Sequence, residues 1–148
     1  MFENREILIV TKHKKEKVIS PLISKHLKTK TSVATHFDTD LLGTFCGEIE
    51  RNDDPIATLR MKCKKGLEGT DFKISIASEG SFGAHPYIFF APFSEEYMML
   101  YDAENNMEFI VKEATTHTNF ANSTIQYEEE LLQFARKIDF PSHGLILK

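Results

Sequence analysis

The chain contains little of what marks membrane proteins, secreted proteins or strongly basic nucleic-acid binders. No stretch of its 148 residues approaches the roughly 20 consecutive apolar residues that span a bilayer. The amino-terminal segment has a short apolar run but no small-residue cleavage site, so we expect a strand there and not a signal peptide. A net charge of −4 argues against non-specific nucleic-acid binding by the whole surface.

Cysteine is scarce, and common catalytic motifs are missing. The two cysteines, Cys46 and Cys63, lie in unrelated contexts, which argues against a disulfide framework or a paired zinc knuckle and suits a reducing cytoplasm. Nothing fixes Cys46 and the preceding His36 as a nucleophile and its base. There is no Walker loop, no dinucleotide-binding glycine fingerprint and no Gly-x-Ser-x-Gly elbow. The sequence therefore points away from those site classes.

What is present is the pattern of one globular α/β domain. A hydrophobic content of 41% and a charged content of 27% are typical of a chain with a core of its own. Strands are expected at residues 7–10, 31–37, 72–77, 97–101 and 107–111, the last two as a hairpin. One helix is expected to start near Ser20 or to kink there, because Pro21 fits only a first turn. Further helices are expected from Asp54 and after the capping pattern of Ser123 and Gln126. This order implies a mixed β-sheet with helices packed on it, as a single domain over residues 1–148.

A basic cluster directly follows the first expected strand. Thr11 is followed by lysines at positions 12, 14, 15 and 17, opposed only by Glu16. Cations are unfavourable at a helix N-terminus, by roughly 0.3–1 kcal/mol each, unless an anion binds there and reverses the balance. Thr11, Lys14 and Lys15 are therefore candidates to bind a phosphate group. The alternative is a solvated, charged helix face.

Carboxylates in glycine-containing loops are the candidate metal ligands. Asp40 and Glu48 fall in the loop-like segment 38–51, and Glu79 falls in the expected loop 78–86, beyond a strand, where ligands gather in open α/β sheets. Mg²⁺ prefers one or two carboxylates together with substrate phosphates. For segment 38–51 the alternative is a solvent-exposed acidic loop. His85, in the second loop, could polarise a substrate group, although a histidine before proline is more often structural.

Five segments together resemble a bacterial family of uncharacterised proteins. They extend over the whole chain and read TKHKKE, DTDLLGTFCGEIER, ASEGSFGAHP, THTNF and FPSHGLI, of which ASEGSFGAHP is the most specific. Relatives continue beyond the segment that is like FPSHGLI. The resemblance thus implies that these residues could form the amino-terminal part of a longer architecture.

The order of the motifs is also similar to the inosine-triphosphate pyrophosphatase superfamily. The resemblance implies the fold of that superfamily and a phosphate-binding loop at Thr11. It also implies a helix that carries Lys62 and is preceded by Thr44 and Glu48. The sequence departs from the pattern at His13, at Glu16 and at Gly144, which stand where Asn, Lys and Arg are usual. The site expected in full comprises phosphate binding by Thr11, Lys14, Lys15 and Lys62, catalysis and metal binding by Glu48 and Glu79 with Asp40, and base or sugar contacts by Ser142, His143 and His85.

These residues support three hypotheses. The first is a Mg²⁺-dependent hydrolase that binds a phosphorylated small molecule, in the first instance a nucleotide. The second is a non-catalytic nucleotide or phosphometabolite sensor, motivated by the shifted lysine position and the missing arginine. The third is an interaction module that pairs with another chain or with a missing carboxyl-terminal domain, motivated by the apolar residues 145–147. A homodimer is the form of pairing with a second copy.

Overall fold

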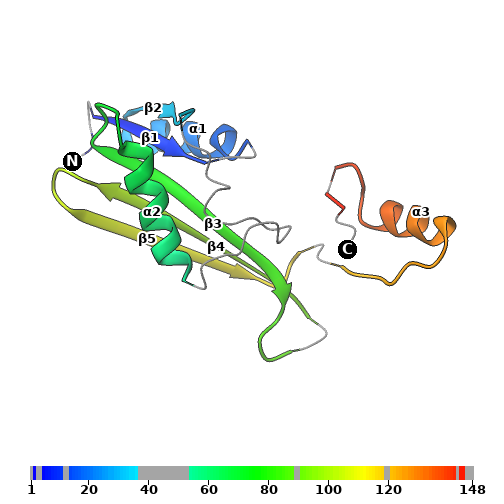
Figure 1. Cartoon of the computed structure of the whole chain (residues 1–148). Coiled ribbons are helices and arrows are strands. Elements are labelled where there is room, and N and C mark those ends of the chain that lie inside the picture. Colours follow the sequence, from blue (N-terminus) through cyan, green and yellow to red (C-terminus); the bar gives the residue numbers. More distant parts are fainter. Residues whose placement is uncertain are drawn as a thin grey trace. The chain divides into compact units, whose positions relative to one another are not determined.

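The computed structural model describes residues 2, 5–11, 14–36, 54–88, 91–118, 121–142 and 144–145, without the side chains of Phe82 and Ala84. In chain order its elements are β1 (Glu6–Val10), α1 (Glu16–Leu27), β2 (Lys30–Val33), α2 (Pro55–Leu67), β3 (Ile74–Ala84), β4 (Pro92–Asp102), β5 (Met107–Thr115) and α3 (Glu128–Lys137) (Figure 1). The chain is of the expected α/β class, with one mixed five-stranded sheet. None of these described helices is both long enough and apolar enough to cross a membrane.

The sheet combines a parallel half and an antiparallel half. Its strand order is β2-β1-β3-β4-β5, and β1 is parallel to both β2 and β3. β3 and β4 are antiparallel, because the N–H of His85 donates to the carbonyl of Ala91 and the N–H of Ala103 donates to that of Lys73. β4 and β5 are joined by a short turn at residues 103–106, so the hairpin predicted there is confirmed, with longer strands.

Apolar side chains pack on both faces of the sheet. On the face covered by α1, one buried cluster contains Ile7, Ile9, Ile19, Ile74 and Ile76. On the face covered by α2, a second buried cluster contains Leu8, Val10, Leu59, Cys63, Ala77, Met99 and Tyr101. Successive residues of β1 enter opposite clusters, as the pleat of a strand requires. The continuous apolar run of β1 therefore reflects burial on both sides.

Helix α1 begins earlier than the sequence predicts. A start or kink near Ser20 was expected, but α1 runs through Pro21, which lies in its second turn. The proline removes an intrahelical hydrogen bond at this position. Ile19 before it and Ile23 after it both pack against the same apolar cluster of the sheet. Burial on both sides of the proline thus outweighs its unfavourable helix propensity.

Helix α2 begins where the sequence predicts. The carboxylate of Asp54 accepts a hydrogen bond from the N–H of Ile56 at 2.9 Å, and Pro55 occupies the first turn. Near the other end of the helix, Gly66 lies against β1. A Cβ atom at position 66 would come within 2.3 Å of Val10 Cγ2, so the close approach of α2 to β1 depends on this glycine.

Strand β3 is longer than the sequence predicts. Residues 78–84, expected as loop, continue the strand, and the chain reverses between the end of β3 at Ala84 and the start of β4 at Pro92 instead. Hydrogen bonding to β4 outweighs the weak strand propensity of the glycines and serines in this segment. The reversal is held by His85, whose Nδ1 accepts hydrogen bonds from the N–H groups of Tyr87 and Ile88, both at 3.2 Å.

The chain divides into two compact units. The first consists of residues 1–81 and 96–113, and the second of residues 82–95 and 114–148. Helix α3 of the second unit does not begin at the predicted Ser123 cap. Instead, the carboxylate of Glu130 accepts a hydrogen bond from the N–H of Gln126 at 2.8 Å, and acidic residues fill the first turn. Negative charge there complements the helix dipole.

Candidate functional site

The carboxyl end of β1 forms a step in the sheet. β1 ends at Val10, whereas its neighbour β3 continues to residue 84. Val10 pairs with Ala77, so the same register places Thr11 beside Ser78. We call the region of Thr11, Ser78, Glu79 and Gly80 the β1 step.

The β1 step lies at the switch point of the parallel half of the sheet. The chain leaves β1 through α1 to reach β2 on one side, and it returns through α2 to β3 on the other side. The two helices contribute to apolar clusters on opposite faces (Figure 1). Ligands of open α/β sheets bind outside the carboxyl ends of the strands at such a point. The topology therefore marks the β1 step as the candidate site.

On one face of the sheet, Lys15 at the start of α1 reaches the β1 step. Its Nζ lies 3.1 Å from both carboxylate oxygens of Glu96 on β4. The carboxylate lies directly over Gly80 of β3, because a Cβ atom there would lie 2.3 Å from Glu96 Oε1, and a side chain at position 80 would make the carboxylate move. The neighbouring Lys14 is exposed and has a φ of +64°, and the N-cap residue Lys15 makes no capping hydrogen bond with its side chain in the described part of the chain. The helix start thus presents cationic side chains and backbone N–H groups together.

On the other face, Lys62 of α2 forms a buried ion pair with Glu79. The Nζ–Oε2 distance is 2.5 Å, and the side chains are only 12% and 9% exposed. The same Nζ lies 3.5 Å from the carbonyl oxygen of Ser78. Desolvating two charges costs several kcal/mol per ion in order of magnitude, so a buried pair is poor evidence of stabilisation. A role in ligand binding explains the burial of this ion pair better than a contribution to stability does.

The two ion pairs lie on opposite faces of the sheet, which the sequence did not reveal. Side chains alternate along β3, so Glu79 shares the α2 face with Ala77, while Ser78 and Gly80 share the α1 face with Ile76. Lys15 and Glu79 therefore do not belong to one side of the sheet. They approach the same strand end from two sides, because β1 stops there and β3 does not.

Among the described residues of the β1 step, Ser78 is the one whose side chain has no hydrogen-bond partner in the part of the chain that the structure describes. It is 7% exposed, and its Oγ forms no hydrogen bond within the described part of the chain. A buried hydroxyl without a partner costs about 1–3 kcal/mol. By strand alternation it faces the side from which α1 begins, beside Thr11. A ligand oxygen or a bound water would remove this cost.

The structure brings together part of the site expected from the sequence. Thr11, Lys14, Lys15, Lys62 and Glu79 all belong to the first unit and lie around the β1 step. The metal ligands Glu48 and Asp40, and His143, fall outside the described residues. In the described part, no three His, Cys, Asp or Glu side chains gather as a metal site.

The predicted base and sugar residues belong to the second unit, and their binding roles stay predictions. Ser142 lies in a turn after α3. His85 has a structural role: besides accepting two backbone hydrogen bonds, its ring meets the ring of Phe93 edge-on at 4.9 Å between centroids. These contacts favour the structural role that was expected as the alternative for a histidine before proline.

Sequence reasoning missed two residues of the β1 step. Glu96 was assigned no role, and Ser78 was placed in a loop. The register of β3 against β4 would have identified Glu96. Residue 85 bonds to residue 91 and residue 73 bonds to residue 103, so position 80 lies opposite position 96. This register could not be recognised in the sequence, because two glycines interrupt the alternating pattern of β3.

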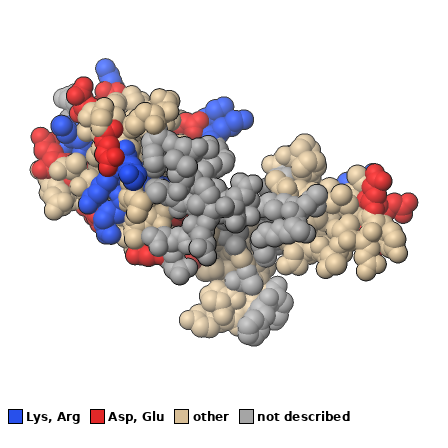
Figure 2. All heavy atoms as spheres, in the orientation of Figure 1, with Lys and Arg blue, Asp and Glu red and all other residues tan. Residues whose placement is uncertain are grey.

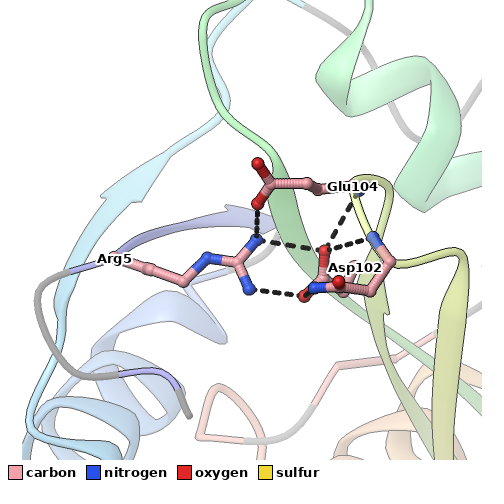
Figure 3. A network of polar contacts seen from close by, with 4 residues as sticks. Arg5, Asp102 and Glu104 are labelled. Carbon is pink, nitrogen blue, oxygen red and sulfur yellow. Dashed lines mark hydrogen bonds and ion pairs between the residues drawn. The ribbon is translucent and has the colours of Figure 1, made fainter.

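The opposite end of the sheet carries a different polar network. Arg5 donates to Asp102 at 2.5 and 3.1 Å and to Glu104 at 2.8 Å, and Asn105 donates to Asp102 at 2.8 Å (Figure 3). Hydrogen bonds from Arg5 above all lower the pKa of Asp102 to about 2. An open cavity of about 240 Å³ lies here, lined by Arg5, Glu6, Asp71, Phe72, Lys73 and Ile74. Because this cavity lies at the amino ends of the strands, we favour the β1 step as the site.

Charges of both signs are interspersed over the surface. On the face shown in Figure 2, lysines and arginines of the first unit stand next to acidic residues. One such pair is Arg60 of α2 with Glu108 of β5, whose contacts measure 2.5 and 2.8 Å. This arrangement agrees with the low net charge and favours local recognition of an anion over a broad basic surface.

Comparison with known proteins gives a family but no activity. No curated protein matches the chain. The solved structure of the hypothetical protein CT253 from Chlamydia trachomatis is 12% identical over 89% of this chain and 84% of that one, and its TM-score of 0.29 does not establish a common fold. Residues 62–148 match the family described as a domain of unknown function, DUF6671, and because this is more than half of the sequence, the chain belongs to that family.

Proposed function

We propose that the chain binds the phosphate groups of a nucleotide at the β1 step and hydrolyses the nucleotide in the presence of Mg²⁺. The observation that carries the proposal is the approach of two lysines to one strand end from opposite faces, Lys15 from α1 and Lys62 from α2. The phosphate groups of a nucleotide offer several acceptor oxygens, so each lysine can bind one of them. The N–H groups at the start of α1 favour an anion at the same place.

The unpartnered hydroxyl of Ser78 supports the same site. A phosphate oxygen within reach would accept its hydrogen bond and relieve the cost of burying it. Ser78 is already buried in the chain without ligand. Its side chain therefore loses little further conformational freedom on binding, which is the advantage of a preorganised site.

The charge balance favours a metal–phosphate complex over a bare anion. Each lysine is held by a carboxylate, Lys15 by Glu96 and Lys62 by Glu79. A bare phosphate would have to compete with both carboxylates. When a lysine turns from its carboxylate to bind the phosphate, Mg²⁺ that arrives with the phosphate can bind that carboxylate. Every charged group then keeps a partner of opposite charge.

Glu79 suits Mg²⁺ by its donor chemistry. Mg²⁺ binds hard oxygen ligands and is commonly held by one or two carboxylates plus substrate phosphates, so one acid of this kind is enough to take part. Glu48 and Asp40 are the further ligands we propose. Bound Mg²⁺ would neutralise charge on the leaving phosphate and favour deprotonation of water. The lysines would fix the phosphate groups in position for this reaction.

Thermal unfolding with nucleoside mono-, di- and triphosphates, each with and without Mg²⁺, tests binding first. A ligand at 100 times its Kd stabilises the folded state by about 2.7 kcal/mol, which is an easily measured shift. Lys15→Ala should reduce the shift, and Lys25→Ala, which removes an exposed lysine from the last turn of the same helix, should not. Absence of a shift with every nucleotide would overturn the proposal.

Ser78→Ala separates binding from folding. The substitution removes a buried hydroxyl that has no partner among the residues the structure describes, so the ligand-free protein should be as stable as the wild type or more stable. The nucleotide-induced shift should nevertheless become smaller. An unchanged shift would exclude Ser78 from the site.

Release of phosphate or pyrophosphate tests hydrolysis. Glu79→Gln should abolish Mg²⁺-dependent turnover while leaving some nucleotide binding, because the lysines and Ser78 remain. A Glu79→Gln variant with the wild-type rate would remove Glu79 from the mechanism. Circular dichroism and the melting temperature of the variant show whether it is folded.

The second candidate function is a nucleotide or phosphometabolite sensor without turnover. The observation that favours it is that Glu79 and Glu96 are both neutralised by lysines in the chain without ligand. Such pairs can bind a metal–phosphate complex without activating water. Saturable binding with no product after hours would support the sensor, whereas any turnover that depends on Glu79 would exclude it.

A further inference from the structure

Strand β5 leaves an apolar edge of the sheet exposed. It is the last strand in the order of the described sheet, and most of its residues are exposed. Its central side chains, Phe109, Ile110 and Val111, are 45%, 39% and 65% exposed. A long edge strand with exposed apolar residues is a template for pairing with another strand. Its occupant can be inferred from the sequence of the strand.

The side chains of β5 alternate between the two faces of the sheet. Phe109 meets Phe2 edge-on, with 6.2 Å between ring centroids, and Phe2 packs against the apolar cluster on the α1 face. Glu108 points to the other face, where Arg60 of α2 donates to it. Lys112 lies on that face too, with its Nζ 5.1 Å from the ring centroid of Tyr97.

We propose that β5 pairs antiparallel with β5 of a second copy of this chain, about a two-fold axis at Ile110. In this register Glu108 stands opposite Lys112 of the second copy, and Lys112 stands opposite the second copy's Glu108. Phe109 stands opposite Val111 of the second copy on the other face. The strand is thus complementary to itself in charge and in apolar character, as an isologous contact requires.

Neighbouring registers lack this charge complementarity. A displacement of one residue sets Glu108 opposite Glu113 or Val111 of the second copy, depending on its direction, and turns one sheet over. A displacement of two residues sets Lys112 opposite Ile110 or Asn106. A lysine in an edge strand normally opposes pairing, and it does so less when the partner supplies an acid opposite to it.

The existing contacts of the two charged residues are compatible with this pairing. Glu108 accepts from Arg60 through both oxygens, and a carboxylate has further lone pairs for the lysine of the second copy. The ammonium group of Lys112 carries three N–H donors, and turning it from the Tyr97 ring of β4 towards the second copy would exchange a cation–π contact for an ion pair. The pairing would extend each five-stranded sheet across the axis.

Light scattering coupled to size exclusion, together with analytical ultracentrifugation, tests the proposal. The wild-type chain should be a dimer, and Lys112→Glu should raise the dissociation constant at least tenfold by placing glutamates opposite each other. Lys25→Glu makes the same charge change on an exposed part of α1 and should leave the dimer intact. A wild-type monomer at the highest concentration examined, or a dimer that withstands Lys112→Glu, would overturn it.

Cross-linking tests the register independently. In a chain with Cys46 replaced by serine, Ile110→Cys should give a disulfide-linked dimer on mild oxidation, since the two positions face each other across the axis. Glu113→Cys is the matched control, because its two copies would be about 20 Å apart at about 3.3 Å per residue. Cross-linking of the control as efficiently as of Ile110→Cys would exclude this register. Circular dichroism shows whether each variant is folded.

Discussion

Arg5 and Asp102 are 97 positions apart in the sequence and form a two-point ion pair, with contacts of 2.5 and 3.1 Å. The pair joins the residue before β1 to the end of β4 (Figure 3). The side chain of Asp102 is fully buried, and that of Arg5 is 24% exposed. Asp102 also accepts hydrogen bonds from the backbone N–H groups of Glu104 and Asn105, at 3.1 and 3.2 Å. One carboxylate thus fixes both the turn after β4 and the entry to β1.

Arg5→Ala should lower the free energy of unfolding by about 2–3 kcal/mol, because it leaves a buried carboxylate without its cation. Urea-induced unfolding followed by circular dichroism measures the change. Glu104→Ala removes only the exposed acid of the same network, whose side chain is 64% exposed, and should cost no more than about 0.5 kcal/mol. Equal losses in the two variants would show that Asp102 does not depend on Arg5.

The Arg5–Asp102 pair should weaken in acid. The pKa of Asp102 is lowered from 3.8 to about 2, mainly by hydrogen bonds from Arg5. A lowered folded-state pKa stabilises the protein above the unfolded-state pKa, and this contribution is lost as the pH falls through the folded-state value. The wild type should therefore lose up to about 2 kcal/mol between roughly pH 4 and pH 2, less any solvent screening. Arg5→Ala should lose less over this range, and identical pH profiles would contradict the assignment.

The Lys62–Glu79 pair should show strong coupling. Lys62→Met leaves Glu79 buried without its cation and should cost about 3 kcal/mol, whereas adding Glu79→Gln removes the stranded charge and should recover most of the loss. A double-mutant cycle in urea measures the coupling free energy. If the two costs simply add, the buried contact does not contribute to folding in the way proposed.

Gly66→Ala should destabilise the fold by about 1–3 kcal/mol, because the new methyl group would overlap Val10, a stiff side chain buried in the core. Gly83→Ala is the matched control, since a Cβ atom there meets nothing within 4 Å, and it should change stability by no more than about 0.5 kcal/mol. Thermal melting of both variants measures the difference. A Gly66→Ala protein as stable as the wild type would mean that α2 can move away from β1 without cost.

Cys63 should be inert towards thiol reagents in the folded protein. It is fully buried in the α2-face cluster, and this burial raises its pKa to about 11. Only about one thiol in a thousand would then be ionised near pH 8, and the reagent would also need access. In a Cys46→Ser chain, a colorimetric thiol reagent should detect Cys63 only after denaturant is added. Rapid labelling of the native protein would indicate local opening of α2.

Several elements were predictable because their signals are local. The apolar run of β1, the Asp54 cap and the hairpin of β4 and β5 each depend on residues that are close in sequence, and all three are confirmed. The prediction that α1 starts near Ser20 was wrong, and so was the predicted length of β3. In both cases distant packing or hydrogen bonding decided: Ile19 and Ile23 hold α1 through Pro21, and pairing with β4 extends β3 through its glycines.

The sequence by itself determined the α/β class and the residue types of the candidate site, because periodicity and clusters of charge depend on residues that are close in the sequence. Only the tertiary structure decided that Lys15 pairs with Glu96, that Lys62 pairs with Glu79, and that these pairs lie on opposite faces of the sheet. The physical reason is the alternation of side chains along β3 together with its register against β1 and β4. A change of one residue in register would move every side chain of the strand to the other face, and no short segment of sequence fixes that choice.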